Sequence, residues 1–137
     1  MNKKHSTPIQ IRFNDFDLAG HIYNAVYQEY LDSAKMNYFS EVLGDLIDWK
    51  TNGLVIASIQ IDYASPILLG DTISIKSRVS EMGDKSIKMT QFVMKNNETE
   101  PVATGITTLV CFNFKKRESI LIPDEWRQAI TNFETDL

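Results

Sequence analysis

A long segment with helical periodicity, followed at once by segments with strand character, restricts the folds open to this chain. Between Asn24 and Gly44 apolar residues recur at the spacing of one helix face. The recurring residues are Tyr27, Tyr30, Leu31, Ala34, Tyr38 and Val42. A helix of about twenty residues exceeds the globular average of about 11–12. We predict one long helix, capped by the side chain of Asn24 and stopped at Gly44, whose aromatic side is buried against a broad surface.

The residues around this helix supply such a surface. Turn-forming residues separate segments that are rich in β-branched residues or that alternate apolar and polar side chains. These segments are residues 8–14 before the helix, and Leu54–Tyr63, Thr72–Glu81, Ser86–Lys95 and Val102–Phe114 after it. Consecutive strands joined by tight turns pair antiparallel. We predict an α+β fold in which the helix packs on a five-stranded antiparallel sheet, with a short helix beginning near Pro123.

Length and composition exclude several classes of protein. A chain of 137 residues suits one domain, residues 1–137. Lys and Arg number 14 against 18 Asp and Glu, a net charge of -4, which argues against a nucleic-acid binder. One cysteine, Cys111, and two histidines, His5 and His21, argue against a disulfide framework and against a metal centre. We expect no metal and no cofactor.

The chain also lacks the apolar runs that membranes require. No stretch of about 18 consecutive apolar residues is present, and the polar residues at positions 1–5 do not precede an apolar run of signal length. We therefore expect a cytoplasmic protein without a membrane partner. His5 is expected to lie in a mobile terminus, and Cys111, between Val110 and Phe112, is expected to be packed in the core.

The loop before the helix carries the most specific pattern. It reads Asp15-Phe16-Asp17-Leu18-Ala19-Gly20-His21-Ile22-Tyr23-Asn24, and Asp62-Tyr63, Pro66 and Gly70-Asp71 follow further on. An Asp-x-Asp-x-x-Gly loop with a strand before it and a long helix after it resembles the hot-dog-fold acyl-CoA thioesterases of the 4-hydroxybenzoyl-CoA thioesterase type. The resemblance implies a sheet that wraps around the helix. It also implies a homodimer or homotetramer, paired through the sheets, that binds acyl-CoA between subunits.

The resemblance assigns the chemistry residue by residue. The second carboxylate of the pair is Asp17, which either attacks the thioester or activates a water. The oxyanion donor is a backbone N–H at or next to Asn24, and a helix N-terminus does offer unpaired N–H groups and a partial positive charge. His21 would orient the carboxylate or the thioester, although Tyr23 replaces an Asn that several branches carry. Asp15 is expected to fix the loop.

Further residues have both a packing and a functional interpretation. Tyr27 is expected to form core or pocket wall, and Asn24 to act as both cap and site residue. Ser58 stands where strands of the resembled family approach the thioester, but no histidine accompanies it in a Ser-His-Asp pattern. The charged helix residues Asp32, Lys35 and Glu41 fall mostly on faces other than the aromatic one, although other hot-dog lineages use a helix carboxylate as catalyst.

Two alternative functions stay open. A hot-dog module can bind acyl-CoA without hydrolysing it, as a sensor or regulatory subunit, but such a binder does not need the carboxylate of Asp17. Hydrolysis of thioesters on acyl carrier protein would favour a basic docking face, which the net charge of -4 argues against. The sequence does not identify the acyl group.

Overall fold

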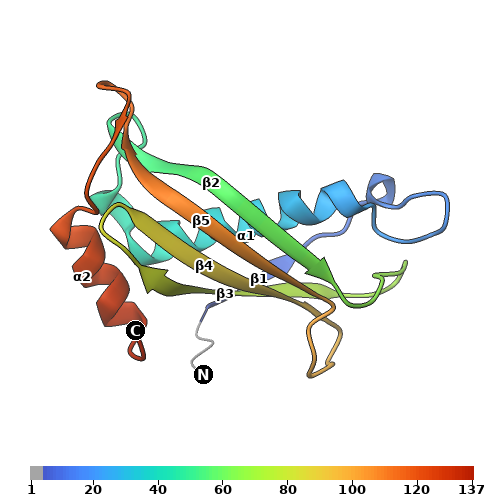
Figure 1. Cartoon of the computed structure of the whole chain (residues 1–137). Coiled ribbons are helices and arrows are strands. Elements are labelled where there is room, and N and C mark those ends of the chain that lie inside the picture. Colours follow the sequence, from blue (N-terminus) through green and yellow to red (C-terminus); the bar gives the residue numbers. More distant parts are fainter. Residues whose placement is uncertain (1–4) are drawn as a thin grey trace.

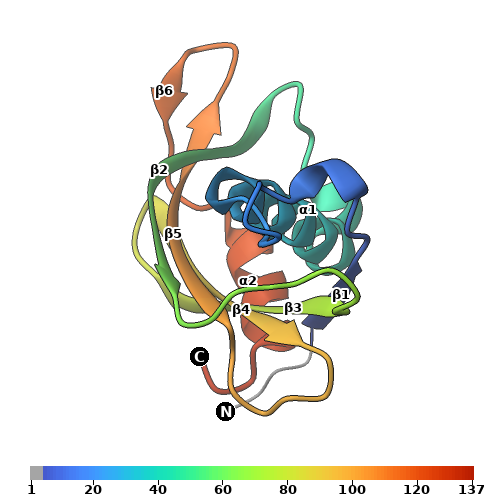
Figure 2. The ribbon, with the colours of Figure 1, turned by 90° about the vertical axis from the view of Figure 1, so that its right-hand side faces the viewer.

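The computed structural model describes residues 5–137. A curled antiparallel sheet with strand order β1-β3-β4-β5-β2 lies against one long helix, α1 (Figure 1). The two-residue strand β6 pairs with β5 (Figure 2). The elements are β1 (His5–Ile9), α1 (Asn24–Val42), β2 (Asn52–Tyr63), β3 (Ile73–Met82), β4 (Ser86–Lys95), β5 (Ala103–Asn113), β6 (Glu118–Ser119) and α2 (Asp124–Phe133). Short 3-10 helices cover Phe13–Asp15 and Gly44–Leu46. The predicted α+β architecture and the order of its elements are confirmed.

The core follows the length of α1. Figure 2 shows α1 lying in the hollow of the curled sheet, and Figure 1 shows α2 near the C-terminal end of α1. Tyr27 and Leu31 pack with residues of β3 and β5 in one apolar cluster. Tyr38 and Phe39 pack with Trp126 of α2 and its neighbours in a second cluster. The aromatic side of the helix is therefore buried, as its spacing predicts.

The first strand lies further toward the N-terminus than the prediction of residues 8–14. The β1 ladder runs from His5 to Ile9, and Ile9 pairs with Ile73 at the first residue of β3. Beyond it the chain turns into a 3-10 helix, because the Asp15 carboxylate accepts the backbone N–H of Arg12. His5 is accordingly not in a mobile segment. It is 3% exposed, and its Nε2 lies 2.7 Å from Glu41 Oε2.

Lys35 corrects the expectation that charged residues of α1 lie mostly on exposed faces. It is 3% exposed, and its ammonium group donates to Gln91 Oε1 at 3.0 Å and to Thr107 Oγ1 at 3.3 Å. Asp32 Oδ1 lies 3.5 Å from the same nitrogen. Burial lowers the pKa of Lys35, and the charge of Asp32 opposes that shift. These polar partners on β4 and β5 make the buried position tolerable.

A bulge in β2 decides which of its side chains face α1. Directly paired residues share a face of the sheet, and β2 pairs with β5 as Ile56↔Leu109 and then Ser58↔Thr108, with a register shift between them. Leu109 is buried, whereas Thr108 is only partly so. Ser58 therefore shares the outer face of the sheet with Thr108, away from α1, and is exposed.

Within residues 5–137, no helix combines the length and the apolar character needed to cross a membrane.

Candidate active site

Asp17 sits in a narrow loop that its own carboxylate helps to shape. Asp17 Oδ1 accepts the backbone N–H of Ala19 at 2.9 Å and that of His21 at 3.1 Å. The Asp17 N–H donates to the His21 carbonyl at 2.8 Å, and Gly20 turns the chain with a φ of 78°. The side chain is exposed, and Oδ2 takes part in none of these bonds. The loop thus fixes one carboxylate oxygen of Asp17 and gives no hydrogen bond to the other.

Asp15, the other carboxylate of the loop, is buried and anchors the loop to α1. It is 2% exposed, and its Oδ2 accepts the Tyr30 hydroxyl at 2.6 Å and the Arg12 N–H at 2.9 Å. Burial alone would raise the pKa of Asp15, but these hydrogen bonds and the Arg12 charge outweigh it and lower the pKa. The prediction that Asp15 fixes the loop is confirmed, with a helix residue as an unexpected partner.

Asp17 lines a cavity of about 290 Å³ between the loop, the start of α1 and the end of β2. Its lining consists of Asp17, His21, Ile22, Asn24, Tyr27, Tyr63, Ala64, Ser65 and Pro66. The structure therefore brings together four of the five predicted site residues: Asp17, His21, Asn24 and Tyr27. Ser58 does not line this cavity, and its substrate-binding role stays a prediction.

Two tyrosines form one wall of the cavity. The rings of Tyr27 and Tyr63 pack edge to face, with centroids 4.9 Å apart and planes at 86°. The Tyr63 hydroxyl donates to the carbonyl of Asn24 at 3.3 Å. Burial raises the pKa of Tyr27. Tyr63 belongs to the Asp62-Tyr63 pair that supports the resemblance, so the sequence held a signal from which its place in the cavity lining could have been predicted.

The helix begins differently from the prediction. Tyr23, with φ −63° and ψ 134°, is the capping residue, Asn24 is the first helical residue, and no side chain caps the helix. The loop fixes this helix start, because the Tyr23 N–H donates to the carbonyl of Asp15 at 2.8 Å. Among the hydrogen bonds of the described residues, none takes up the backbone N–H of Asn24 or Ala25. These N–H groups carry the partial positive charge of the helix N-terminus, and Asn24 lines the same cavity as Asp17.

Other reactive side chains of the described residues lie elsewhere. Cys111 is fully buried, as predicted, and burial raises the pKa of its thiol to about 11. Asp32 and Glu41 lie one to four turns further along α1 than Tyr27 and pair with Lys35 and His5. Within residues 5–137 no three His, Cys, Asp or Glu side chains gather in a way that could hold a metal ion.

Comparison with known proteins places this fold and loop in one family. Residues 11–130 match the thioesterase-like superfamily. The chain belongs to this superfamily. Membership in the thioesterase-like superfamily confirms the predicted enzyme class, a thioester hydrolase, and the hot-dog fold.

Several proteins named as thioesterases are similar along nearly the whole chain. The long-chain acyl-CoA thioesterase FadM of Escherichia coli K12 is 28% identical over 90% of this chain and 95% of its own. The acyl-acyl carrier protein thioesterase ATL3 of Arabidopsis thaliana is 26% identical over 97% of this chain and 70% of its own. A thioesterase from Thermus thermophilus, solved with coenzyme A and Zn, superimposes with a TM-score of 0.82 at 30% identity, covering 95% and 93% of the two chains.

Proposed function

We propose that this protein hydrolyses an acyl-CoA thioester to the free acid and coenzyme A, with Asp17 as nucleophile or general base. The observation that carries the proposal is that Asp17 and the first turn of α1 line one cavity. A thioester bound there would meet a carboxylate on one side and unpaired N–H groups on the other. Hydrolysis needs both, because negative charge develops on the carbonyl oxygen as the carbon is attacked.

Two routes fit this arrangement. In the first, a carboxylate oxygen of Asp17 attacks the carbonyl carbon, the C–S bond breaks, coenzyme A leaves as the thiolate, and water then hydrolyses the acyl–Asp anhydride. In the second, Asp17 accepts a proton from a water that attacks the carbonyl, and the tetrahedral intermediate collapses with release of the thiol. In both routes the backbone N–H of Asn24 or Ala25 stabilises the oxyanion.

His21 and Asn24 are proposed to bind the substrate. Both side chains are exposed and line the cavity. Since no side-chain bond of Asn24 caps the helix, its amide is available to hydrogen-bond a thioester. The backbone N–H of His21 donates to Asp17, so the imidazole is available to contact the substrate.

A homodimer or homotetramer stays part of the proposal. Pairing of two chains through their sheets needs a strand with an unpaired edge, and β2 lies at the end of the described strand order. Ile56 on that strand is 44% exposed although its paired partner Leu109 is buried. An apolar side chain left open at an edge strand fits an interface between copies.

The test is thiol release from a panel of aliphatic and aryl acyl-CoA thioesters by the wild type and Asp17→Asn. Asparagine keeps an oxygen that can accept the Ala19 and His21 N–H groups, so the loop should persist while the charge is lost. We expect kcat to fall by about 10²–10⁴. The matched control, Asp84→Asn, alters an exposed carboxylate outside the cavity and should keep the wild-type rate.

The same panel, extended to acyl-carrier-protein thioesters, separates the two alternative functions. Tight acyl-CoA binding without turnover would favour a binding module. The similarity to a plant acyl-acyl carrier protein thioesterase makes acyl carrier protein the second candidate carrier. Turnover of acyl-carrier-protein thioesters with little release from acyl-CoA would favour that carrier. Full activity of Asp17→Asn would overturn the proposed role of Asp17.

A further inference from the structure

The segment of residues 64–72, between β2 and β3, backs the loop that carries Asp17. The Ile22 N–H donates to the carbonyl of Ile67 at 3.0 Å, and His21 forms an antiparallel bridge with Leu68. The His21 N–H in turn donates to Asp17 Oδ1. The 64–72 segment is therefore connected to the carboxylate oxygen of Asp17 through one bridge and one hydrogen bond.

Asp71 closes this segment into a turn. Its Oδ2 accepts the Leu68 N–H at 2.8 Å, while the Asp71 N–H donates to the Leu68 carbonyl at 3.1 Å. Gly70 has a φ of 96°, the left-handed conformation that the turn needs and that favours glycine. The reciprocal pair of bonds fixes Leu68, the residue that bridges to His21.

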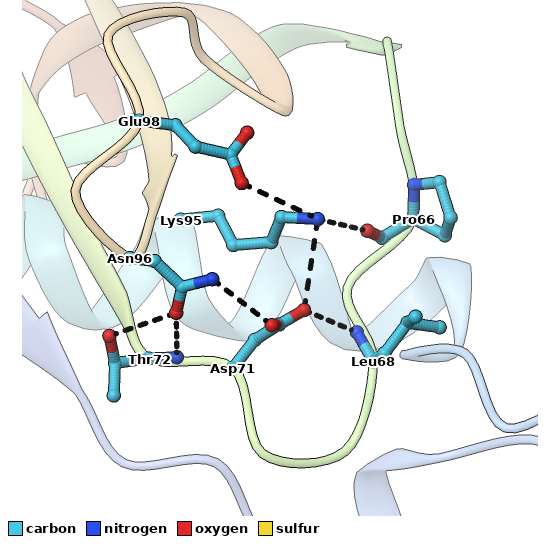
Figure 3. A network of polar contacts seen from close by, with 7 residues as sticks. All are labelled: Pro66, Leu68, Asp71, Thr72, Lys95, Asn96 and Glu98. Atoms are coloured by element: carbon cyan, nitrogen blue, oxygen red, sulfur yellow. Dashed lines mark hydrogen bonds and ion pairs between the residues drawn. The ribbon is translucent and has the colours of Figure 1, made fainter.

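The last residue of β4, Lys95, and the next residue, Asn96, hold Asp71 from the other side, as Figure 3 shows. Asn96 Nδ2 donates to Asp71 Oδ1 at 3.1 Å, and Asn96 Oδ1 accepts the Thr72 N–H at 2.9 Å. Lys95 Nζ lies 3.8 Å from Asp71 Oδ2 and donates to the Pro66 carbonyl at 3.3 Å. Lys95 thus contacts the segment at two points, and one of them, Pro66, lines the cavity.

We infer that Asp71 and Lys95 are positioning residues that set the place of Asp17 through the 64–72 segment. Neither side chain lines the cavity, so both act through Leu68, Pro66 and the bridge to His21. The inference rests on the proposed catalytic role of Asp17. The hydrogen bond from Leu68, with lesser help from Asn96 and Lys95, lowers the pKa of Asp71, which favours the charged form that Lys95 contacts.

The test compares Asp71→Ala, Asp71→Asn and Lys95→Met in thiol release from the acyl-CoA that the wild type turns over fastest. Small misplacement of a catalytic group can cost on the order of 10²-fold, so we expect Asp71→Ala to lower kcat by about 10- to 100-fold with KM within about twofold. Asparagine retains an acceptor for the Leu68 N–H and should restore most of the rate. Glu98→Gln is the control, since Glu98 pairs with the same Lys95 at 3.8 Å but makes no described contact with the 64–72 segment.

A double mutant separates positioning from general damage to the fold. If Asp71 acts through the Asp17 carboxylate, Asp71→Ala should cost less than about twofold in the Asp17→Asn background, because coupled residues are not additive. An equal loss in both backgrounds would overturn the inference. Should Asp71→Ala fail to unfold cooperatively, Lys95→Met, which leaves the Leu68–Asp71 turn intact, takes its place in the same cycle.

The inference and the proposed function fail in different ways. Wild-type turnover by Asp17→Asn overturns the proposed catalytic role of Asp17, whatever Asp71 does. Wild-type turnover by both Asp71→Ala and Lys95→Met, with Asp17→Asn impaired, overturns only the positioning role. A loss in kcat that depends on Asp17 supports both.

Discussion

The hydroxyl of Tyr30, on the second turn of α1, donates a 2.6 Å hydrogen bond to the buried carboxylate of Asp15. This bond joins the long helix to the loop that carries Asp17, two residues further on. Because the Asp15 carbonyl also accepts the N–H of Tyr23, one residue sets both the path of the loop and the start of the helix. The site geometry therefore depends on a contact that lies outside the cavity.

Tyr30→Phe should destabilise the protein by about 1–3 kcal/mol, because it leaves a buried carboxylate oxygen short of one hydrogen bond. The measurement is urea unfolding at neutral pH. Tyr23→Phe is the matched control, since Tyr23 is 56% exposed and its hydroxyl makes no bond among the described contacts. Equal midpoints for the two variants would show that the Tyr30 hydroxyl contributes nothing.

Acid should remove stability that comes from Asp15. Its pKa is lower in the folded state than the ordinary value near 3.8, so the unfolded chain binds the proton first as pH falls. This contribution is complete above the unfolded pKa and is lost as pH falls through the lower folded pKa. Unfolding free energies of wild type and Asp15→Asn should thus converge below about pH 4. Parallel curves across that range would contradict the assignment.

His21→Ala should impair catalysis less than Asp17→Asn does. The loop holds Asp17 through the backbone of His21, not through the imidazole, so the carboxylate stays in place when the side chain is removed. We expect kcat/KM to fall by about tenfold, against about 10²–10⁴ for the loss of the base or nucleophile. Steady-state thiol release measures both. A loss as large as that of Asp17→Asn would give the imidazole a direct part in the chemistry.

Lys35 predicts a second pH dependence of stability, at alkaline pH and with the same sign as that of Asp15. Burial lowers its pKa in the folded state below the ordinary value of 10.5, so between those two values the unfolded chain binds more protons. Stability relative to Lys35→Met should therefore rise with pH through that window. Urea unfolding of both proteins at a series of pH values up to about 10.5 tests this. A constant difference would mean that the environment of Lys35 does not disfavour its charge.

Much of the fold could be predicted because it is encoded locally. Helical spacing from Tyr27 to Val42 and alternation in segments such as Ser86–Lys95 depend only on neighbouring residues, and α1 and β4 lie where those patterns place them. The Asp17 loop was equally accessible, since its spacing and its position between a strand and a helix are visible in the sequence.

The errors concern residues whose partners are distant in sequence. Nothing near Lys35 indicates that Gln91 and Thr107 will satisfy its ammonium group, and a lysine is rarely buried without such partners. His5 is buried because Glu41 and the ring of Tyr38 meet it across the fold. The capping role moved from Asn24 to Tyr23 because Asp15 holds the chain there.

The register shift beside Ala57 sets the face on which each later side chain of β2 lies. Ile56 and Ile59 are three residues apart, yet their partners Leu109 and Thr107 share the inner face of β5. In a regular strand of the same length, with Ala57 paired instead of bulged out, every side chain beyond Ala57 would lie on the opposite face. Tyr63 would then turn away from Tyr27, and the cavity beside Asp17 would lose a wall. The bulge at Ala57, in the middle of an edge strand, thus decides whether Tyr63, six positions later, can line the cavity.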